Sequence, residues 1–257
     1  MGWGLVTMRR TRSIFVSVSL LGGVFLVSHG PAAAQATAVG GGAAGVQISA
    51  FQGTEPANPL RGAFAQAAYP QVTLPPEGSP LLTREAGDES GVVVTSPLID
   101  SAVLQIAKAR VTTEGNLQGS PYAESRATVG YVRIGKLPIM SVQTHCRWDT
   151  TGVSATTSLT LANGENIAPP PNTTIPISGI GSVVVNQQFR ETLSDGSEVI
   201  YVSGIHLALN PKAAAAAATP TTVEVDIALS SCDPNKLPFA TGGGLLLSTG
   251  PETGGVI

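Results

Sequence analysis

The feature of this sequence that most constrains its fold is a series of segments in which apolar and polar residues alternate with a period of two. The clearest covers residues 222–229, where Val223, Val225, Ile227 and Leu229 alternate with Thr222, Glu224, Asp226 and Ala228. Such alternation is typical of a strand with one face in a core and the other in water. Segments rich in Val, Ile, Thr and Tyr predict further strands at residues 92–95, 102–113, 123–134, 139–148, 153–161, 182–193 and 199–209.

Turn residues separate these segments at the places that an antiparallel sheet requires. Asp195-Gly196 lies between the segments 182–193 and 199–209, and Gly at such a position tolerates the positive φ of a tight hairpin. The sequence therefore predicts an all-β fold, an antiparallel β-sandwich in a single domain with disordered termini. We place that domain at residues 46–234, with a strand near Gln71–Leu74 in a proline-rich region that disfavours central strands.

The first 34 residues have the pattern of an export signal. Arg9, Arg10 and Arg12 precede an uncharged run at residues 14–27, and Ala32-Ala33-Ala34 supplies small residues for cleavage. The run is too short to span a bilayer comfortably. We therefore expect a mature chain that starts near Gln35, has no stable membrane span, and is secreted or extracellular, with loose association with the cell envelope left open.

Composition predicts two flexible ends and excludes one class of partner. Residues 35–45 are small and glycine-rich, and residues 235–257 are dominated by Gly, Pro and Thr, so both are expected to be disordered. Removal of the three arginines of the signal leaves 11 basic and 17 acidic side chains, a net charge of −6. Nucleic-acid binding needs clustered Lys and Arg, so it is not expected.

The two cysteines, Cys146 and Cys232, are expected to form a disulfide, because an even pair in an exported chain is oxidised most simply. The loop of about 85 residues would lose denatured-state entropy worth roughly 4–5 kcal/mol. The alternatives are two buried reduced thiols, or one cysteine paired with a partner protein.

Residues from about Val46 to Asp233 resemble a secreted actinobacterial domain of the choice-of-anchor P type. The resemblance lies in the order of DSAVLQIAKARV, SVQTHCRWD, VSATTSLTLANG, PPPNTTIPISGIGSVVVNQQ, YVSGIHLALN and VEVDIALSSC. It implies an exported bacterial domain whose relatives end in different wall or membrane anchors. We expect no such anchor at the C-terminus of this chain, which argues against wall attachment, and the resemblance implies no catalytic residue.

No residue pattern predicts a catalytic site, a metal site or a cofactor. His145 adjoins Cys146, but neighbours on a strand point to opposite faces, so it is poorly placed to activate that thiol. His206 is expected opposite the apolar face of segment 199–209, facing solvent or a second sheet. Trp148 could stack on a sugar, although a tryptophan near a cystine more often packs as core. Trp148 and His206 are thus the two weak candidates for binding.

These observations favour a non-enzymatic structural or recognition module of the extracellular space or the cell envelope. Its partner would be an unknown envelope glycan or protein. The alternative is a secreted carboxylate-dependent hydrolase of wall polymers or glycans, for which Glu191, Asp195 and Glu198 are the clustered carboxylates.

Overall fold

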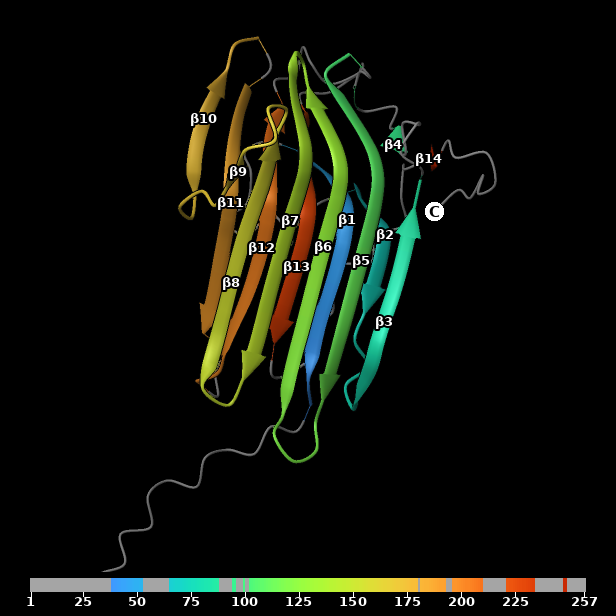
Figure 1. Ribbon diagram of the computed structural model, residues 1–257, viewed down its shortest axis with the longest axis vertical. Coiled ribbons are helices and arrows are strands. Elements are labelled where there is room, and N and C mark those ends of the chain that lie inside the picture. The colour runs from blue at the N-terminus through green and yellow to red at the C-terminus, as the bar shows by residue number, and fades with distance from the viewer. Residues whose placement is uncertain are drawn as a thin grey trace, which may run out of the picture. The chain divides into compact units, whose positions relative to one another are not determined.

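Two antiparallel sheets packed face to face make up the computed structural model (Figure 1). The structure describes residues 38–52, 65–87, 94–95, 99, 102–179, 181–192, 196–209, 221–233 and 247–248. The expected signal and most of the expected C-terminal tail lie outside these residues. The described residues contain no helix that is long and apolar enough to cross a membrane.

Each of the two large sheets has six strands. Sheet A has the order β10 (Thr173–Ile177), β11 (Gly181–Thr192), β12 (Glu198–Leu209), β13 (Thr221–Asp233), β1 (Gly40–Gln52) and β2 (Ala65–Thr73). Sheet B has the order β3 (Gly78–Ala86), β5 (Leu104–Asn116), β6 (Tyr122–Ile134), β7 (Leu137–Asp149), β8 (Gly152–Leu161) and β9 (Asn166–Ile167). A small separate pair joins β4 (Val94–Thr95) to β14 (Leu247–Ser248).

The all-β prediction is confirmed, and the proline-rich region does form strands at sheet edges, β2 and β3. β1 starts at Gly40, within residues 35–45, which the sequence predicts to be disordered and to precede the domain. Its first residues pair with the end of β13, Gly40 opposite Asp233 and Ala44 opposite Leu229. Residues 40–45, expected to be flexible, are therefore part of a central strand.

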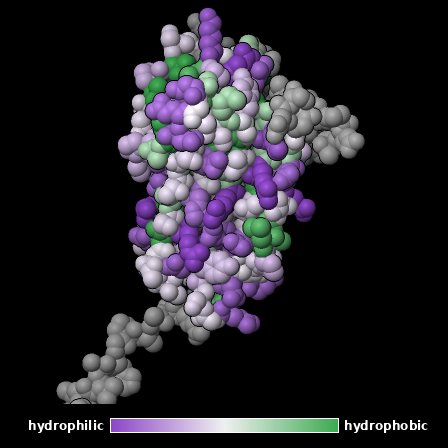
Figure 2. Space-filling view, viewed as in Figure 1, coloured by the Kyte–Doolittle hydropathy of each residue, from purple (hydrophilic) through white to green (hydrophobic). Residues whose placement is uncertain are grey.

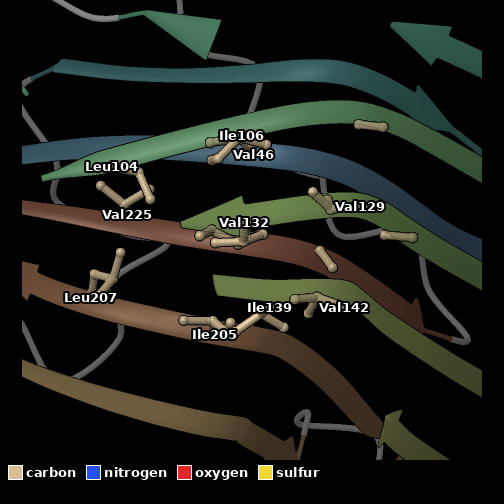
Figure 3. Close-up of a cluster of buried hydrophobic side chains, with 14 of the residues drawn as sticks. Val46, Leu104, Ile106, Val129, Val132, Ile139, Val142, Ile205, Leu207 and Val225 are labelled. Carbon is tan, nitrogen blue, oxygen red and sulfur yellow. The ribbon is translucent and has the colours of Figure 1, made fainter. Parts of the chain in front are cut away.

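The main core lies between the two sheets and consists of branched aliphatic side chains. Figure 3 shows Ile106, Val132 and Val142 of sheet B meeting Val46 and Ile205 of sheet A. All five are at most 1% exposed. Burial of a side chain of this size stabilises a fold by about 1.5–3 kcal/mol, so this layer holds the sheets together.

A second buried cluster surrounds a disulfide that links the sheets. Cys146 of β7 and Cys232 of β13 are bonded, with Cα atoms 5.9 Å apart, and both are fully buried. Trp148, Ile200 and Val202 belong to the same cluster. The predicted pairing is confirmed, and it joins one central strand of each sheet.

In sheet A, side chains alternate between the two faces of each strand, and this alternation is interrupted along one row of residues that crosses five strands. Register places Asn186, Gly204, Ala228, Gly45 and Pro70 side by side on five neighbouring strands, and we call them the irregular row. Asn186 and Ala228 have positive φ angles of 52° and 55°. Backbone of this kind changes the direction of the following side chains, as in a β-bulge.

The shift corrects the predicted faces of β13. Ile227 and Cys232 both point toward sheet B, although they lie an odd number of residues apart and simple alternation would oppose them. Leu229 consequently lies on the face away from sheet B, and not on the face of Ile227 as the sequence predicts. The positive φ of Ala228 is the local cause.

Glycines of the irregular row allow the two sheets to come close together. A Cβ atom on Gly45 would lie 2.6 Å from Cβ of Ala109 in β5 and 2.8 Å from Cδ of Pro70. One on Gly204 would overlap Cγ1 of Val142 in β7. Side chains at these two positions would force the sheets apart.

We expect Gly45→Ala and Gly204→Ala each to lower the free energy of unfolding by roughly 1–3 kcal/mol, because both would overpack the space between the sheets. Denaturant titration measures this. Gly130→Ala in β6 is the matched control, because its nearest atoms would be 3.4 Å away or more. An equal loss in all three variants would contradict the close-packing explanation.

Reduction of the disulfide is expected to lower the free energy of unfolding by roughly 4–5 kcal/mol, because it releases a loop that spans 86 positions. Thiol titration of the native and the denatured protein checks the bond itself. Two thiols that react before reduction would show that the pair is not oxidised in solution.

Candidate functional site

The outer face of sheet B carries a regular array of polar side chains. Strand alternation directs Ala123, Ser125 and Ala127 of β6 inward, and Glu124, Arg126 and Thr128 outward. The register then places outward residues of neighbouring strands in rows. The rows are Arg110, Thr128, Gln143 and Ser158; Thr112, Arg126, His145 and Thr156; and Glu114, Glu124, Arg147 and Ser154.

Figure 2 shows this face of the molecule. Strongly hydrophilic residues gather over its middle, and smaller hydrophobic areas lie nearer its margins. In the part of the chain that the structure describes, Leu81 of the edge strand β3 is the most exposed large apolar side chain, at 55%. The centre of the face is therefore suited to hydrogen bonding rather than to apolar docking.

Glu124 is the central hydrogen-bond acceptor of the array, although it is only 8% exposed. Its Oε1 accepts a hydrogen bond from Nε of Arg126 at 3.0 Å, and its Oε2 accepts one from Nη1 of Arg147, also at 3.0 Å. Nε2 of His145 lies 3.1 Å from Oε1. Two arginines from neighbouring strands thus hold one carboxylate in place, and the His145 ring lies beside it.

Arg147 extends the cluster along β7 and β6. Its Nε donates to Oδ2 of Asp149 at 3.2 Å, and its guanidinium lies 5.0 Å from the centre of the Tyr122 ring. A cation above an aromatic face at this distance is attracted by the ring quadrupole. The orientation of Arg147 is therefore fixed from three sides.

The environment keeps Glu124 ionised and favours a neutral His145. Burial raises the pKa of Glu124, but hydrogen bonds from Arg126 and Arg147 outweigh it, and the net pKa lies below the ordinary value. Burial and the nearby charge of Arg126 lower the pKa of His145, although Glu124 opposes this. At neutral pH the immediate surroundings of Glu124 thus hold its carboxylate, the guanidinium groups of Arg126 and Arg147, and the uncharged imidazole of His145.

Two adjoining hollows lie over the array. The first, of about 390 Å³, is lined by Leu81, Arg110, Thr112, Glu114, Glu124, Arg126 and Thr128. The second, of about 240 Å³, is lined by Arg126, Thr128, Gln143, Thr144, His145, Thr156 and Ser158. Because Arg126 and Thr128 line both, the hollows form one strip across β5, β6, β7 and β8, which we call the polar strip.

Trp148, His206 and Glu198, singled out in the sequence, lie or point away from the polar strip, whereas His145 lines its second hollow. Trp148 is 8% exposed and packs in the cluster of the disulfide, so its ring is not presented at the surface. Arg190 and Glu198 form a half-exposed ion pair at 3.7 Å across β11 and β12. Asp195 lies outside the described residues.

His206 lies opposite the core-facing side chains of β12, as its parity predicts, but it does not face solvent. It is 2% exposed, and its Nδ1 lies 3.0 Å from Oδ1 of Asp226 on β13. Glu224 and Asp226, expected on a wet face, are likewise 0% and 3% exposed. The register of β12 with β13 places His206 beside Asp226, which periodicity within one strand does not reveal.

Sequence reasoning missed the Glu124 cluster, although a signal for it exists. Ile134 pairs with Leu137 around the two-residue turn at Gly135, which has a φ of 57°. A tight hairpin fixes the register of both strands, and continuing that pairing places Glu124 opposite Arg147. No group of three or more His, Cys, Asp or Glu side chains suited to a metal ion occurs among the described residues.

Comparisons of the chain with protein-family models, with curated proteins and with solved structures find no match. The resemblance to a choice-of-anchor domain therefore stays a prediction.

We expect Glu124→Gln to be less stable than the unchanged protein by roughly 1.5–3 kcal/mol at pH 7, because charged hydrogen bonds are lost. The pKa of Glu124 is lower in the folded chain, so its stabilising effect is present above the ordinary pKa of 4.5 and is lost as the pH falls through the folded pKa. Denaturant titrations from neutral to acid pH measure the difference.

The control is Glu85→Gln on the same face, whose pair with Arg110 is half-exposed at 3.3 Å and should matter by less than about 1 kcal/mol. A deficit of Glu124→Gln that stays constant far below pH 4.5 would show that the carboxylate charge is not its cause.

Proposed function

We propose that the protein is an exported, non-enzymatic module of the extracellular space or the cell envelope, and that it recognises its partner through the polar strip. The observation that carries the proposal is a preformed polar surface whose charged groups are already held by neighbours. Such a surface loses little side-chain entropy when a ligand binds, which favours recognition. The inter-sheet disulfide is compatible with an oxidising compartment.

The surface lies on rigid elements rather than on loops. Its side chains come from the middle strands of sheet B, whose inner face is tied to sheet A by the aliphatic core and by Cys146. Sites on regular strands keep their geometry better than sites on loops. We therefore place recognition on the flat of the sheet.

One observation favours the rival function, a carboxylate-dependent hydrolase. Glu114 and Glu124 are direct cross-strand neighbours, and both line the first hollow. Glycoside hydrolysis uses two carboxyl groups, one of which must give up a proton. The lowered pKa of Glu124 makes it a poor proton donor, and its two oxygens already accept bonds from arginines. The acid would therefore have to be Glu114.

We expect a tagged full chain, expressed with export, to retain a specific component of the producing cell's envelope fraction. A protein with Thr128→Val and Gln143→Ala should retain less of it, because both side chains line the second hollow. Thr160→Val is the matched control, because Thr160 lies on β8 outside both hollows and donates to Asn166.

The protein would be a hydrolase, and the recognition proposal wrong, if it released reducing sugars or peptides from wall polymers and Glu114→Gln abolished that activity. The same conclusion would follow for the β11–β12 carboxylates if Glu191→Gln or Glu198→Gln abolished it. Retention of nothing, together with no hydrolysis, would contradict both functions.

A further inference from the structure

We infer that the ligand of the polar strip is a neutral, polyhydroxylated chain, an oligosaccharide without acidic groups, that lies across the strands of sheet B. The inference rests on the proposed recognition function and names its ligand class. Three properties of the strip support it: its length, its balanced charge and its mixture of donors and acceptors.

The strip is long enough for a chain of several units. It runs at right angles to the strands, from Arg110 on β5 to Ser158 on β8. Neighbouring strands lie about 4.8 Å apart, so three steps between strands span roughly 14 Å. The two hollows adjoin, because Arg126 and Thr128 of β6 line both, and an extended chain that crosses β6 could contact both.

The formal charges of the strip sum to zero, with Arg110 and Arg126 against Glu114 and Glu124, which argues against an ionic ligand. Arg126 is paired with Glu124, and Arg110 lies 3.3 Å from Glu85 of β3. The lowered pKa of His145 leaves its imidazole neutral at pH 7. An anion would have to compete with Glu124 for Arg126, and a cation would be repelled by Arg110 and Arg126.

The strip offers both donors and acceptors, as a hydroxylated ligand requires. Thr128, Thr156 and Ser158 carry hydroxyl groups, each of which both donates and accepts. The amide of Gln143 does the same with separate atoms, while the arginines only donate and Glu114 only accepts. A sugar hydroxyl matches this mixture because it too donates and accepts.

Leu81 provides an apolar contact at one end of the strip. It lines the first hollow and is 55% exposed, so its side chain is available to the C–H face of a sugar ring. A peptide ligand is less suited, because extended peptides bind by adding to an open sheet edge. The strip lies on the flat of the sheet, where the backbone groups of β6 and β7 are already paired.

The test is titration of the uniformly ¹⁵N-labelled protein with cellohexaose, laminarihexaose, maltohexaose and mannohexaose, each followed by amide shifts, with hexagalacturonate as the acidic counterpart. We expect at least one neutral sugar to shift amides of β5 to β8, with affinity that salt does not change. Thr128→Val and Gln143→Ala should each weaken binding roughly three- to tenfold, as expected for the loss of a hydrogen bond.

Thr160→Val should bind as the unchanged protein does, because its side chain lies outside both hollows. Binding of hexagalacturonate alone, abolished by salt, would overturn the inference, because the strip would then select charge. Neutral-sugar binding that Thr128→Val and Gln143→Ala leave unchanged would overturn the site. No amide shift with any of the sugars at millimolar concentration would overturn the ligand class.

Failure of this inference is distinguishable from failure of the proposed function. One outcome is that the retained component of the envelope fraction is a protein whose retention falls with Thr128→Val. In that case the proposed recognition by the polar strip stands, and the inferred ligand class is wrong. If retention survives both substitutions, recognition stands and lies elsewhere on the molecule. Retention of no component removes the basis of both.

Discussion

The close approach of the two sheets is the constraint on which the rest of the structure depends. At the irregular row the inner face of sheet A presents Gly45 and Gly204, where any Cβ would meet Ala109 or Val142. Sandwich interiors are close-packed, so small residues at the centre must be matched by larger ones on either side. Aliphatic side chains fill the space on one side of the row, and the disulfide with Trp148 fills it on the other.

This packing gives the outer face of sheet B its order. β5, β6 and β7 cannot shift against one another without moving the aliphatic side chains that contact sheet A, so their outer side chains stay in register. Glu124 adds a second restraint, because it joins Arg126 of its own strand to Arg147 of the next. The polar strip is thus held from beneath by the core and along its surface by charged hydrogen bonds.

A considerable part of the candidate site follows from sequence alone. Once the turn at Gly135 is accepted, pairing outward from it brings Glu124 opposite Arg147 and Arg126 opposite His145. The neighbourhood of Leu81 cannot be derived in this way. β3 joins β5 with an irregular register between Ser79 and Leu82, and no tight turn links the two strands. The hollows also depend on which side chains turn toward Glu124, and that follows from burial and charge in three dimensions.

The sequence by itself determined the β class, the long strands β5, β6, β7, β8, β11, β12 and β13, and the hairpin of β11 and β12, because period-two patterning and turn residues act within one stretch of chain. The expected cysteine pair came from the count of two in an exported chain. Only the tertiary structure decided that the small residues 40–45 form a central strand, that Leu229 leaves the face of Ile227, and that His206 is buried beside Asp226. Each depends on a partner far away in the sequence. The glycines and alanines of residues 40–45 predict a flexible segment when the sequence is considered locally. Two closely packed sheets nevertheless require such small residues where they approach each other.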